Sequence, residues 1–347
     1  MEEIAGKILE TIRDYRNDDG LSLDSAHIIS WAGQFGEDAE FMLSEISHIL
    51  PEVYISKEKA KDFIDGHLAA LQKEFGYANI TDLLINTEFL DMQEAHKSQP
   101  AILTILENLL NEKYGESYLK YKTYPKVNFV YFDDILASGS TVGRHLLEWL
   151  GSNNSNGVRN ADSILNNSYR LSINLFCSHT WGRSFQQYRL IKTFENKIDK
   201  KISWFWNLEI QNHAKWNNQS FNVAFPTDEQ PANVRSYLAN LTAEKYEDYA
   251  YRKSDTPVQE GFFTSPENRI KYENILLQKG ISIIDMINGE VKPNLRPLGL
   301  INPSYRTFGL GTHFFTWRNI PNNSPLVFWW EVQGHDWQPL FPVANRG

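Results

Sequence analysis

Apolar side chains recur every three or four residues through the first part of the chain, a pattern that predicts amphipathic helices. Three such stretches are Ile4–Ile12 before the turn at 17–20, Phe41–Ile49 before Pro51, and Phe63–Leu71 before Gly76. We therefore expect residues 1–78 to form a helical N-terminal domain. This domain should pack against the rest of the chain without adding a strand to its sheet.

Farther along, short apolar runs alternate with amphipathic stretches, the order that is typical of a parallel α/β sheet. Strands are predicted at Val127–Phe132, Leu171–His179 and Ile202–Ile210, and helices at Pro100–Glu112, Val142–Leu150 and Arg183–Phe194. A later helix is expected to stop at Gly280, with a short strand after it. Residues 79–347 are therefore predicted to form the second domain, an α/β domain with a parallel-sheet core.

Composition narrows the class of protein. Of the 347 residues, 41% are hydrophobic and 22% are charged, which is typical of a folded globular chain. The net charge of −9 gives no reason to expect direct binding of nucleic acid. The single cysteine, Cys177, suits a reducing compartment. No apolar run could span a bilayer and the first residues lack a signal-peptide pattern, so we expect a cytoplasmic protein with no membrane partner.

One segment carries a chemical pattern. The predicted strand ending at Phe132 runs into Asp133 and Asp134, and after two apolar residues come the five small residues Ala137, Ser138, Gly139, Ser140 and Thr141 at the start of a predicted helix. Backbone N–H groups and hydroxyls at a helix N-terminus favour an anion such as a monophosphate. The carboxylates would repel phosphate, but they can accept hydrogen bonds from a diol or position Mg²⁺. Phosphate and diol together describe a ribose 5-phosphate site.

Two other interpretations of this segment stay open. Paired aspartates after a strand also occur in response-regulator receivers, where they bind Mg²⁺, although receivers lack the small-residue loop that follows here. Alternatively, Ser138 or Ser140 could simply cap the helix.

The segment Asp133–Thr141 resembles the signature of type I phosphoribosyltransferases, which bind phosphoribosyl pyrophosphate (PRPP). The resemblance implies that Asp133 and Asp134 serve catalysis by contacting the ribose hydroxyls with Mg²⁺, and that Ala137–Thr141 bind the 5-phosphate. Family members bind diphosphate with a loop after an earlier core strand. The stretch His96–Gln99 lies at the corresponding place, and it offers Lys97 as a cation and Ser98 as a donor.

Beyond this signature, the chain resembles phosphoribosyltransferase-like proteins of bacterial conflict systems, some of them associated with retron reverse transcriptases. Four segments carry the resemblance: Trp31–Phe35, Lys97–Ser98, the Asp133–Thr141 loop, and a tail that contains Pro321-Asn322-Asn323 before Phe328-Trp329. It implies a role in anti-phage defence and a protein partner such as a reverse transcriptase. The chain departs from the pattern at Gln99, where a small residue is common, and at Trp317–Asn319.

The aromatic-rich segment Arg306–Trp330 is expected to be packed core and also to form a hood over the substrate site. Within it, Asn322 and Asn323 could bind the edge of a base or acceptor, or could make turns beside Pro321. The leading hypothesis is a phosphoribosyltransferase-like enzyme. A non-catalytic sensor of PRPP or nucleotides on the same fold, and a hydrolase of nucleotides or sugar phosphates, stay open as alternatives.

Overall fold

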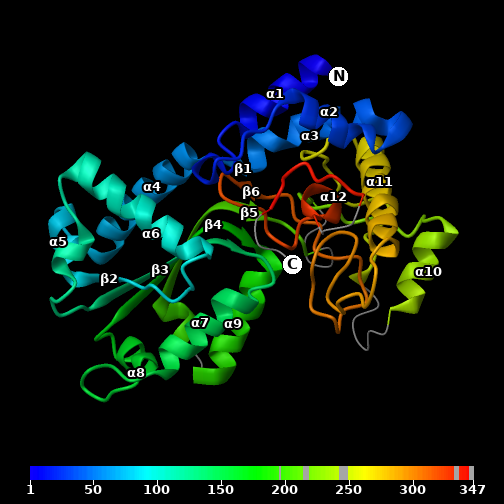
Figure 1. Cartoon of the computed structure of the whole chain (residues 1–347). Coiled ribbons are helices and arrows are strands. Elements are labelled where there is room, and N and C mark those ends of the chain that lie inside the picture. Colours follow the sequence, from blue (N-terminus) through cyan, green and yellow to red (C-terminus); the bar gives the residue numbers. More distant parts are fainter. Residues whose placement is uncertain (195–196, 214–218, 242–248, 332–335, 344–347) are drawn as a thin grey trace. The chain divides into compact units, whose positions relative to one another are not determined.

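The computed structural model of this chain describes residues 1–194, 197–213, 219–241, 249–331 and 336–343 (Figure 1). Its contacts divide it into two compact units. Residues 1–56 and 210–347 form the first, here called the split unit, and residues 57–209 form the second, here called the sheet unit. The domain boundary expected at residue 78 falls inside the sheet unit. That residues 1–78 fold as an independent domain stays a prediction.

The sheet unit is built on four strands. They lie in the order β2 (Thr87–Phe89), β3 (Asn128–Leu136), β4 (Arg170–His179) and β5 (Ile202–Ile210). β3 pairs in parallel with both β2 and β4, and Asn128 lies opposite Thr87 on one side and Arg170 on the other. The three strands predicted from the sequence are confirmed as β3, β4 and β5.

Helices cover both faces of this sheet. Figure 1 shows α4 and α6 on one face and α7 and α9 on the other. The two central strands, β3 and β4, are buried along almost their whole length, as expected for a sheet with helices on both faces. The helical segments of this unit are α4 (Lys57–Phe75), α5 (Ile80–Asn86), α6 (Ser98–Leu109), η3 (Leu110–Tyr114), η4 (Tyr118–Tyr121), α7 (Ser140–Gly151), α8 (Asn160–Leu165), α9 (Thr180–Phe194) and η5 (Ile198–Lys201).

Successive residues of β3 point to opposite faces. Phe129 and Tyr131 belong to a buried cluster with apolar side chains of α7, α8 and α9. Phe132 instead lies on the α4 side, with its ring centroid 5.9 Å from that of His67. Asp133 lies two residues after Tyr131 on the same strand, so its carboxylate points to the same face of the sheet as Tyr131.

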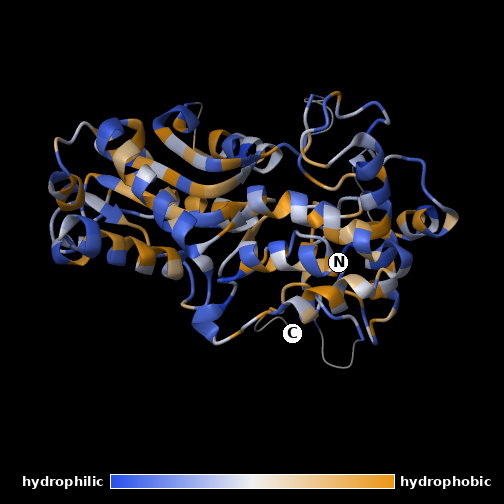
Figure 2. Ribbon diagram, turned by 90° about the horizontal axis from the view of Figure 1, so that it is seen from above, coloured by the Kyte–Doolittle hydropathy of each residue, from blue (hydrophilic) through white to orange (hydrophobic). Residues whose placement is uncertain are grey.

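The split unit joins the two ends of the chain. A two-stranded parallel sheet pairs Tyr54 with Phe315 and Ile55 with Thr316, so the N-terminal segment adds no strand to the four-stranded sheet. Figure 2 shows hydrophobic and hydrophilic residues alternating around the helices, as expected for helices with one buried side. The elements of this unit are α1 (Glu2–Ile12), η1 (Asn17–Asp19), α2 (Ser25–Gly33), η2 (Gly36–Asp38), α3 (Ala39–Val53), β1 (Tyr54–Ile55), α10 (Ala232–Asn240), α11 (Pro266–Asp285), β6 (Phe315–Thr316) and α12 (Leu326–Trp329).

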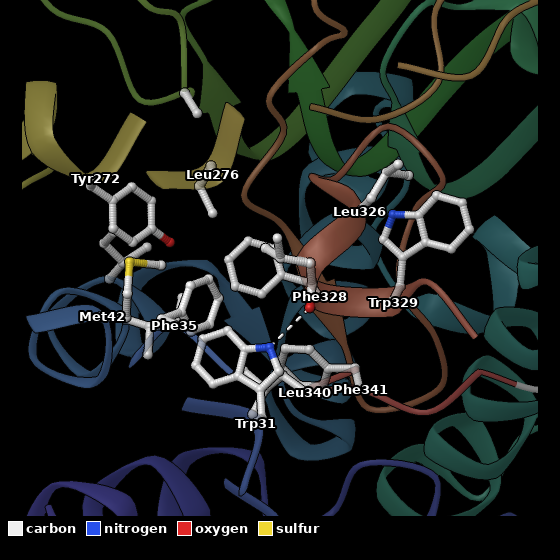
Figure 3. Packing of buried hydrophobic residues seen from close by; sticks show 14 of the residues in the cluster. Trp31, Phe35, Met42, Tyr272, Leu276, Leu326, Phe328, Trp329, Leu340 and Phe341 are labelled. Atoms are coloured by element: carbon white, nitrogen blue, oxygen red, sulfur yellow. Dashed lines mark hydrogen bonds between the residues drawn. The ribbon is translucent and has the colours of Figure 1, made fainter. Parts of the chain in front are cut away.

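The core of the split unit is aromatic, and Trp31 of α2 lies at its centre (Figure 3). The Trp31 indole N–H donates to the carbonyl of Val327 at 2.9 Å, and its ring stacks on Phe328 with centroids 5.9 Å apart. Nearby, Gln34 accepts a hydrogen bond from the backbone N–H of Gln338 and donates one to its carbonyl. Two of the segments that carry the family resemblance thus meet in one core, which accounts for their apolar character.

Two helix ends expected from the sequence are wrong. α11 does not stop at Gly280 but runs to Asp285, and no strand follows it there. A side chain at Gly280 would approach Pro297 to 2.7 Å, so glycine at this position permits close packing instead of ending the helix. α3 likewise continues through Pro51 to Val53, because a proline so close to the end of a helix removes little of its hydrogen bonding.

A network of buried charges fixes α11 within the split unit. Arg269 contacts the carboxylates of Glu260 and Glu273, and Arg252 pairs with Glu273 at 2.9 Å. Two cations therefore balance two anions in the interior. Arg269 also donates to the carbonyl of Val223 at 3.0 Å, so the network joins separate loops to the helix.

The described residues thus form a mixed α/β structure with parallel sheets, N-terminal helices and an aromatic C-terminal cluster, which confirms the predicted fold class. Among the helices of the described residues, none is long and apolar enough to cross a bilayer.

Candidate functional site

The carboxyl ends of two parallel strands and the N-termini of two helices come together in the sheet unit. β2 ends at Phe89, beside Val130 of β3, and residues 90–97 then lead into α6. β3 ends just before the 137–141 loop and α7. Ligands in open α/β sheets bind beyond the carboxyl ends of the strands. The candidate residues Asp133, Asp134 and Ser98 lie at this edge.

Asp133 is buried, with only 3% of its surface exposed, and donors surround both of its carboxylate oxygens. Oδ1 accepts hydrogen bonds from the Ser98 hydroxyl at 2.7 Å and from the backbone N–H of Asp134 at 2.9 Å. Oδ2 accepts from the Gln93 amide at 2.8 Å and from the Tyr131 hydroxyl at 3.0 Å. These donors fix the carboxylate in one orientation.

Burial and the adjacent Asp134 charge raise the pKa of Asp133 to about 7, although hydrogen bonds from Ser98, Asp134 and Tyr131 act in the opposite direction. Asp134 is only partly buried, and its Oδ1 accepts the backbone N–H of Ile135 at 2.8 Å. The first carboxylate is thus held inside the protein and the second lies nearer to solvent. Two adjacent carboxylates of this kind attract a cation.

A hydrogen-bonded chain extends from Asp133 into α7. The Tyr131 hydroxyl lies 2.9 Å from Nδ1 of His145. Because the single hydroxyl proton of Tyr131 is directed to Asp133, the Nδ1 of His145 must be the donor in this contact. Burial and the charge of Arg144 lower the pKa of His145, which favours the neutral ring, here with its proton on Nδ1. His145 therefore orients Tyr131, and Tyr131 orients Asp133.

The 137–141 loop has the form of an anion site. Gly139 is the N-cap residue of α7 with a positive φ of 76°, which glycine adopts readily. The first-turn N–H groups of a helix have no acceptor within the helix, and the N-cap residue Gly139 has no side chain to supply one. The Ser138 hydroxyl accepts from the Ser140 N–H at a long 3.4 Å, so part of the serine cap that the sequence offered is present. Ser140 and Thr141 are exposed at the opening of the loop, where backbone donors of this kind favour an anion.

The second expected loop lies beside the first carboxylate. Lys97 is exposed and is the residue just before α6, and Ser98 is the first residue of that helix. The Ser98 hydroxyl donates to Asp133, so Ser98 links the two loops in this structure. The buried Gln99 accepts from the Met92 N–H at 2.6 Å and donates to the Phe132 carbonyl at 2.9 Å. The departure from the family pattern at Gln99 thus serves to fasten α6 to the end of β3.

Asn322 and Asn323 lie in the split unit, in a turn closed by the Ser324 N–H bonding to the carbonyl of Pro321 at 3.0 Å. The Asn323 amide donates to the Leu300 carbonyl at 2.7 Å and so holds a neighbouring loop. The Asn322 side chain is exposed. Both asparagines therefore take part in a turn, the structural alternative that the sequence offered, and an acceptor-binding role for them stays a prediction.

The residues of the site suit a metal ion that arrives with its ligand better than a resident one. Within the described ranges, no group of three or more His, Cys, Asp or Glu side chains is placed to hold a metal ion. Mg²⁺ commonly uses one or two carboxylates together with substrate phosphates and water. Asp133 and Asp134 fit this requirement as a pair.

Several residues of the site were missed by the sequence analysis. Tyr131 could have been found, because residues two apart on a strand share a face. Gln93 and His145 carried no signal, since only the folded backbone brings them to Asp133 and Tyr131. Gln186 of α9 packs against Gly139 and Gly143. The spacing of these two glycines, one helical turn apart, was the only indication of a close approach by another element.

Comparison with known proteins places the chain in a family. Neither the curated proteins nor the solved structures include a significant match to it. The family model PRTase-CE, which describes a phosphoribosyltransferase-like family, matches residues 28–343 and thus nearly the whole chain, including both units. The parallel sheet and the strand-loop-helix at Asp133–Thr141 agree with this match. The chain belongs to the PRTase-CE family.

Proposed function

We propose that the sheet unit binds PRPP, or a related ribose phosphate, together with Mg²⁺, and that the protein transfers the phosphoribosyl group. The observation that carries the proposal is the 137–141 loop, with Gly139 at a φ of 76° at the start of a helix, shortly after a carboxylate pair on β3. A monophosphate fits the loop, and a diol fits the carboxylates. The family membership supports the same reading.

In this proposal the residues of the site act mainly by positioning and charge. The loop N–H groups would bind the 5-phosphate, and Asp133 would accept a hydrogen bond from a ribose hydroxyl. The bond between C1 and the diphosphate oxygen breaks and the oxygen keeps the electron pair. A new bond forms from C1 to the acceptor, which loses a proton. Positive charge develops on the sugar as the diphosphate leaves, and carboxylates nearby stabilise it.

Lys97 and the bound cation belong to the diphosphate side of the proposal. Mg²⁺ would neutralise the diphosphate and reduce the repulsion between it and the pair Asp133–Asp134. Lys97, exposed before α6, could add a second positive charge. Asn322, whose exposed amide can donate and accept, is the stronger of the two candidates for contacting the acceptor, because the Asn323 amide already bonds to Leu300.

The phosphate assignment can be tested with Gly139→Val. A side chain at this position meets Gln186 within 2.6 Å and needs a backbone conformation that valine rarely adopts. We expect calorimetry to show loss of ribose 5-phosphate binding. The fold should be checked by circular dichroism, and Gly157→Val offers a matched control, because Gly157 also has a positive φ of 75° but nothing within 4 Å of its side-chain position. Equal binding by the Gly139 variant and the wild type would refute the assignment.

A non-catalytic sensor is the second candidate function, and one contact favours it. The Ser98 hydroxyl is committed to Asp133, which leaves the diphosphate side with fewer donors than the sequence suggested. Release of diphosphate from PRPP and Mg²⁺, with and without candidate acceptors, separates the candidates. A transferase releases diphosphate only when an acceptor is present, and it loses this activity in Lys97→Met. A hydrolase releases diphosphate without an acceptor. A sensor binds PRPP but releases no diphosphate.

We also propose that the protein acts in anti-phage defence, with a reverse transcriptase as a possible type of partner. The support is the resemblance to conflict-system proteins alone. Phage challenge of cells that carry the wild-type gene or the Asp133→Asn, Asp134→Asn variant tests this role. Protection by the wild type and its loss in the variant are expected, whereas equal survival with and without the gene would contradict the role.

A further inference from the structure

A glutamine lies behind the candidate phosphate loop. Gln186 of α9 has only 1% of its surface exposed, and it packs against the first turn of α7. A Cβ added at Gly139 would lie 2.6 Å from Nε2 of Gln186, and one added at Gly143 would lie 1.9 Å from its Oε1. The two glycines therefore leave the space that this amide occupies. Gly182, one turn earlier on α9, similarly makes room for the carbonyl of Ala137.

The amide has a defined direction. Nη1 of Arg189 donates to Oε1 of Gln186 at 3.2 Å, which identifies the oxygen end, because a guanidinium can only donate. Oε1 lies beside Gly143 and Nε2 lies beside Gly139, one turn nearer to the start of α7. The amide therefore lies along the first helical turn, with its donor end toward the 137–141 loop.

That donor end has no acceptor. Nε2 of Gln186 is buried, and none of the residues that the structure describes accepts a hydrogen bond from it. A buried donor without a partner is costly, and native proteins rarely keep one without a reason. Because the nitrogen is closed off from solvent, an anion in the loop could not reach it directly. The loop backbone is the nearest source of an acceptor, since the Ala137 carbonyl already lies against α9 at Gly182.

We propose that Gln186 is a positioning residue for the 137–141 loop. When a phosphate group binds at the start of α7, the loop backbone adjusts and one of its carbonyls accepts the unpaired N–H of Gln186. This hydrogen bond then holds the loop in its anion-binding form. The inference rests on the proposed function, since it takes the 137–141 loop as the phosphate site.

Gln186→Met tests the proposal, because methionine keeps the length of the side chain but has no N–H. We expect its affinity for ribose 5-phosphate, measured by calorimetry, to fall by about tenfold, the worth of one buried hydrogen bond. Its stability in urea without ligand should fall by no more than about 1 kcal/mol, because the only printed hydrogen bond of the Gln186 amide that the substitution removes is the one from Arg189. Gln187→Met is the matched control on the same helix and should bind like the wild type.

A second measurement needs no variant. The side-chain amide resonance of Gln186 in the wild-type protein should shift when ribose 5-phosphate saturates the site. An unmoved resonance overturns the proposal, and so does unchanged affinity in Gln186→Met, with or without a loss of ligand-free stability. In either case the proposed function still stands if the wild type binds ribose 5-phosphate and Gly139→Val does not. If the wild type binds neither ribose 5-phosphate nor PRPP, both the proposed function and this inference are wrong.

Discussion

Two carboxylates in this chain are almost equally buried, but their surroundings differ. Glu273 in the split unit is 0% exposed and contacts Arg252 and Arg269. Asp133 in the sheet unit is 3% exposed and is surrounded by neutral donors, with another carboxylate, Asp134, next to it. Burial raises the pKa of both groups. Arg252 and Arg269 act against this effect at Glu273, whereas the Asp134 charge adds to it at Asp133.

The difference separates a structural charge from a functional one. A buried network with equal numbers of cations and anions is complete without a ligand, and it fixes the loops that it joins. A buried carboxylate beside a second one has a raised pKa and attracts a cation, which is typical of functional sites. The comparison predicts that substitutions at Glu273 and its partners affect stability, and that substitutions at Asp133 affect binding.

The largest expected effect comes from breaking the balanced network. Arg269→Met leaves Glu260 without a cation and Glu273 with Arg252 alone. We expect the free energy of unfolding in urea to fall by about 3–5 kcal/mol, as when one partner of a buried pair is removed. Lys271→Met is the control on the same helix, because its pair with Asp38 is half exposed and should contribute less than about 1 kcal/mol. Similar losses in the two variants would contradict the structural role.

A smaller effect is expected at the Asp133–Asp134 pair. Asp133→Asn with Asp134→Asn removes the proposed acceptors for the ribose hydroxyls. Calorimetry should show ribose 5-phosphate binding weakened by about 1–3 kcal/mol, the range for lost hydrogen bonds to charged groups. Binding of inorganic phosphate should change little, since it has no diol. An equal loss for both ligands would mean that the pair only supports the loop.

The pH dependence of stability sharpens the comparison further. The folded protein keeps the Asp133 proton up to a pKa of about 7, whereas the unfolded chain loses it near the ordinary value of 3.8. Asp133 therefore makes the free energy of unfolding fall as pH rises between these values, by up to about 1.4 kcal/mol per pH unit. Urea unfolding at pH 5, 6 and 8 should show this slope in the wild type and a flatter curve in Asp133→Asn. Parallel curves would show that Asp133 is ionised throughout.

The smallest effect is expected from Ser98→Ala, which removes one of the donors to Asp133. The loss should cost about 1 kcal/mol of stability at pH 8, where the carboxylate is ionised, and less at pH 5. The Ser98 bond lowers the pKa of Asp133, so its removal should move the pH dependence to higher pH. Thr104→Ala, on the exposed side of the same helix, is the control. An equal loss of stability at both pH values would mean that the Ser98 bond does not depend on the ionisation of Asp133.

Features encoded by neighbouring residues were predictable from the sequence. The apolar run before Asp133, the small residues after it and the helix from Val142 onward all lie within one short segment, so their pattern indicated strand, loop and helix together. The resemblance of this segment to a known signature also led to the family. The strand at Leu171–His179 was equally clear, because apolar residues alternate with small or polar ones along it, which is typical of a strand.

Features that depend on distant contacts were not predictable. The pairing of Tyr54 with Phe315 joins residues at opposite ends of the chain, and no local pattern indicates it. Gly280 looked like a helix stop because its contact with Pro297 cannot be read from the sequence. The donors around Asp133 come from β3 and from residues 93–98, so the pKa of this group depends on the folded arrangement. Sequence patterns identified the candidate chemistry but not the side chains that tune it.

The split unit has a consequence for the order in which the chain folds during synthesis. Trp31 donates to Val327, a residue 296 positions later, and the ribosome completes the whole sheet unit between the two. The N-terminal helices therefore emerge long before their aromatic partners exist, and their apolar faces stay exposed while translation proceeds. We expect these nascent helices to be bound by chaperones, and the sheet unit to become protease-resistant first. A stalled chain that ends before Val327 would then hold a folded sheet unit and an unfolded N-terminal segment.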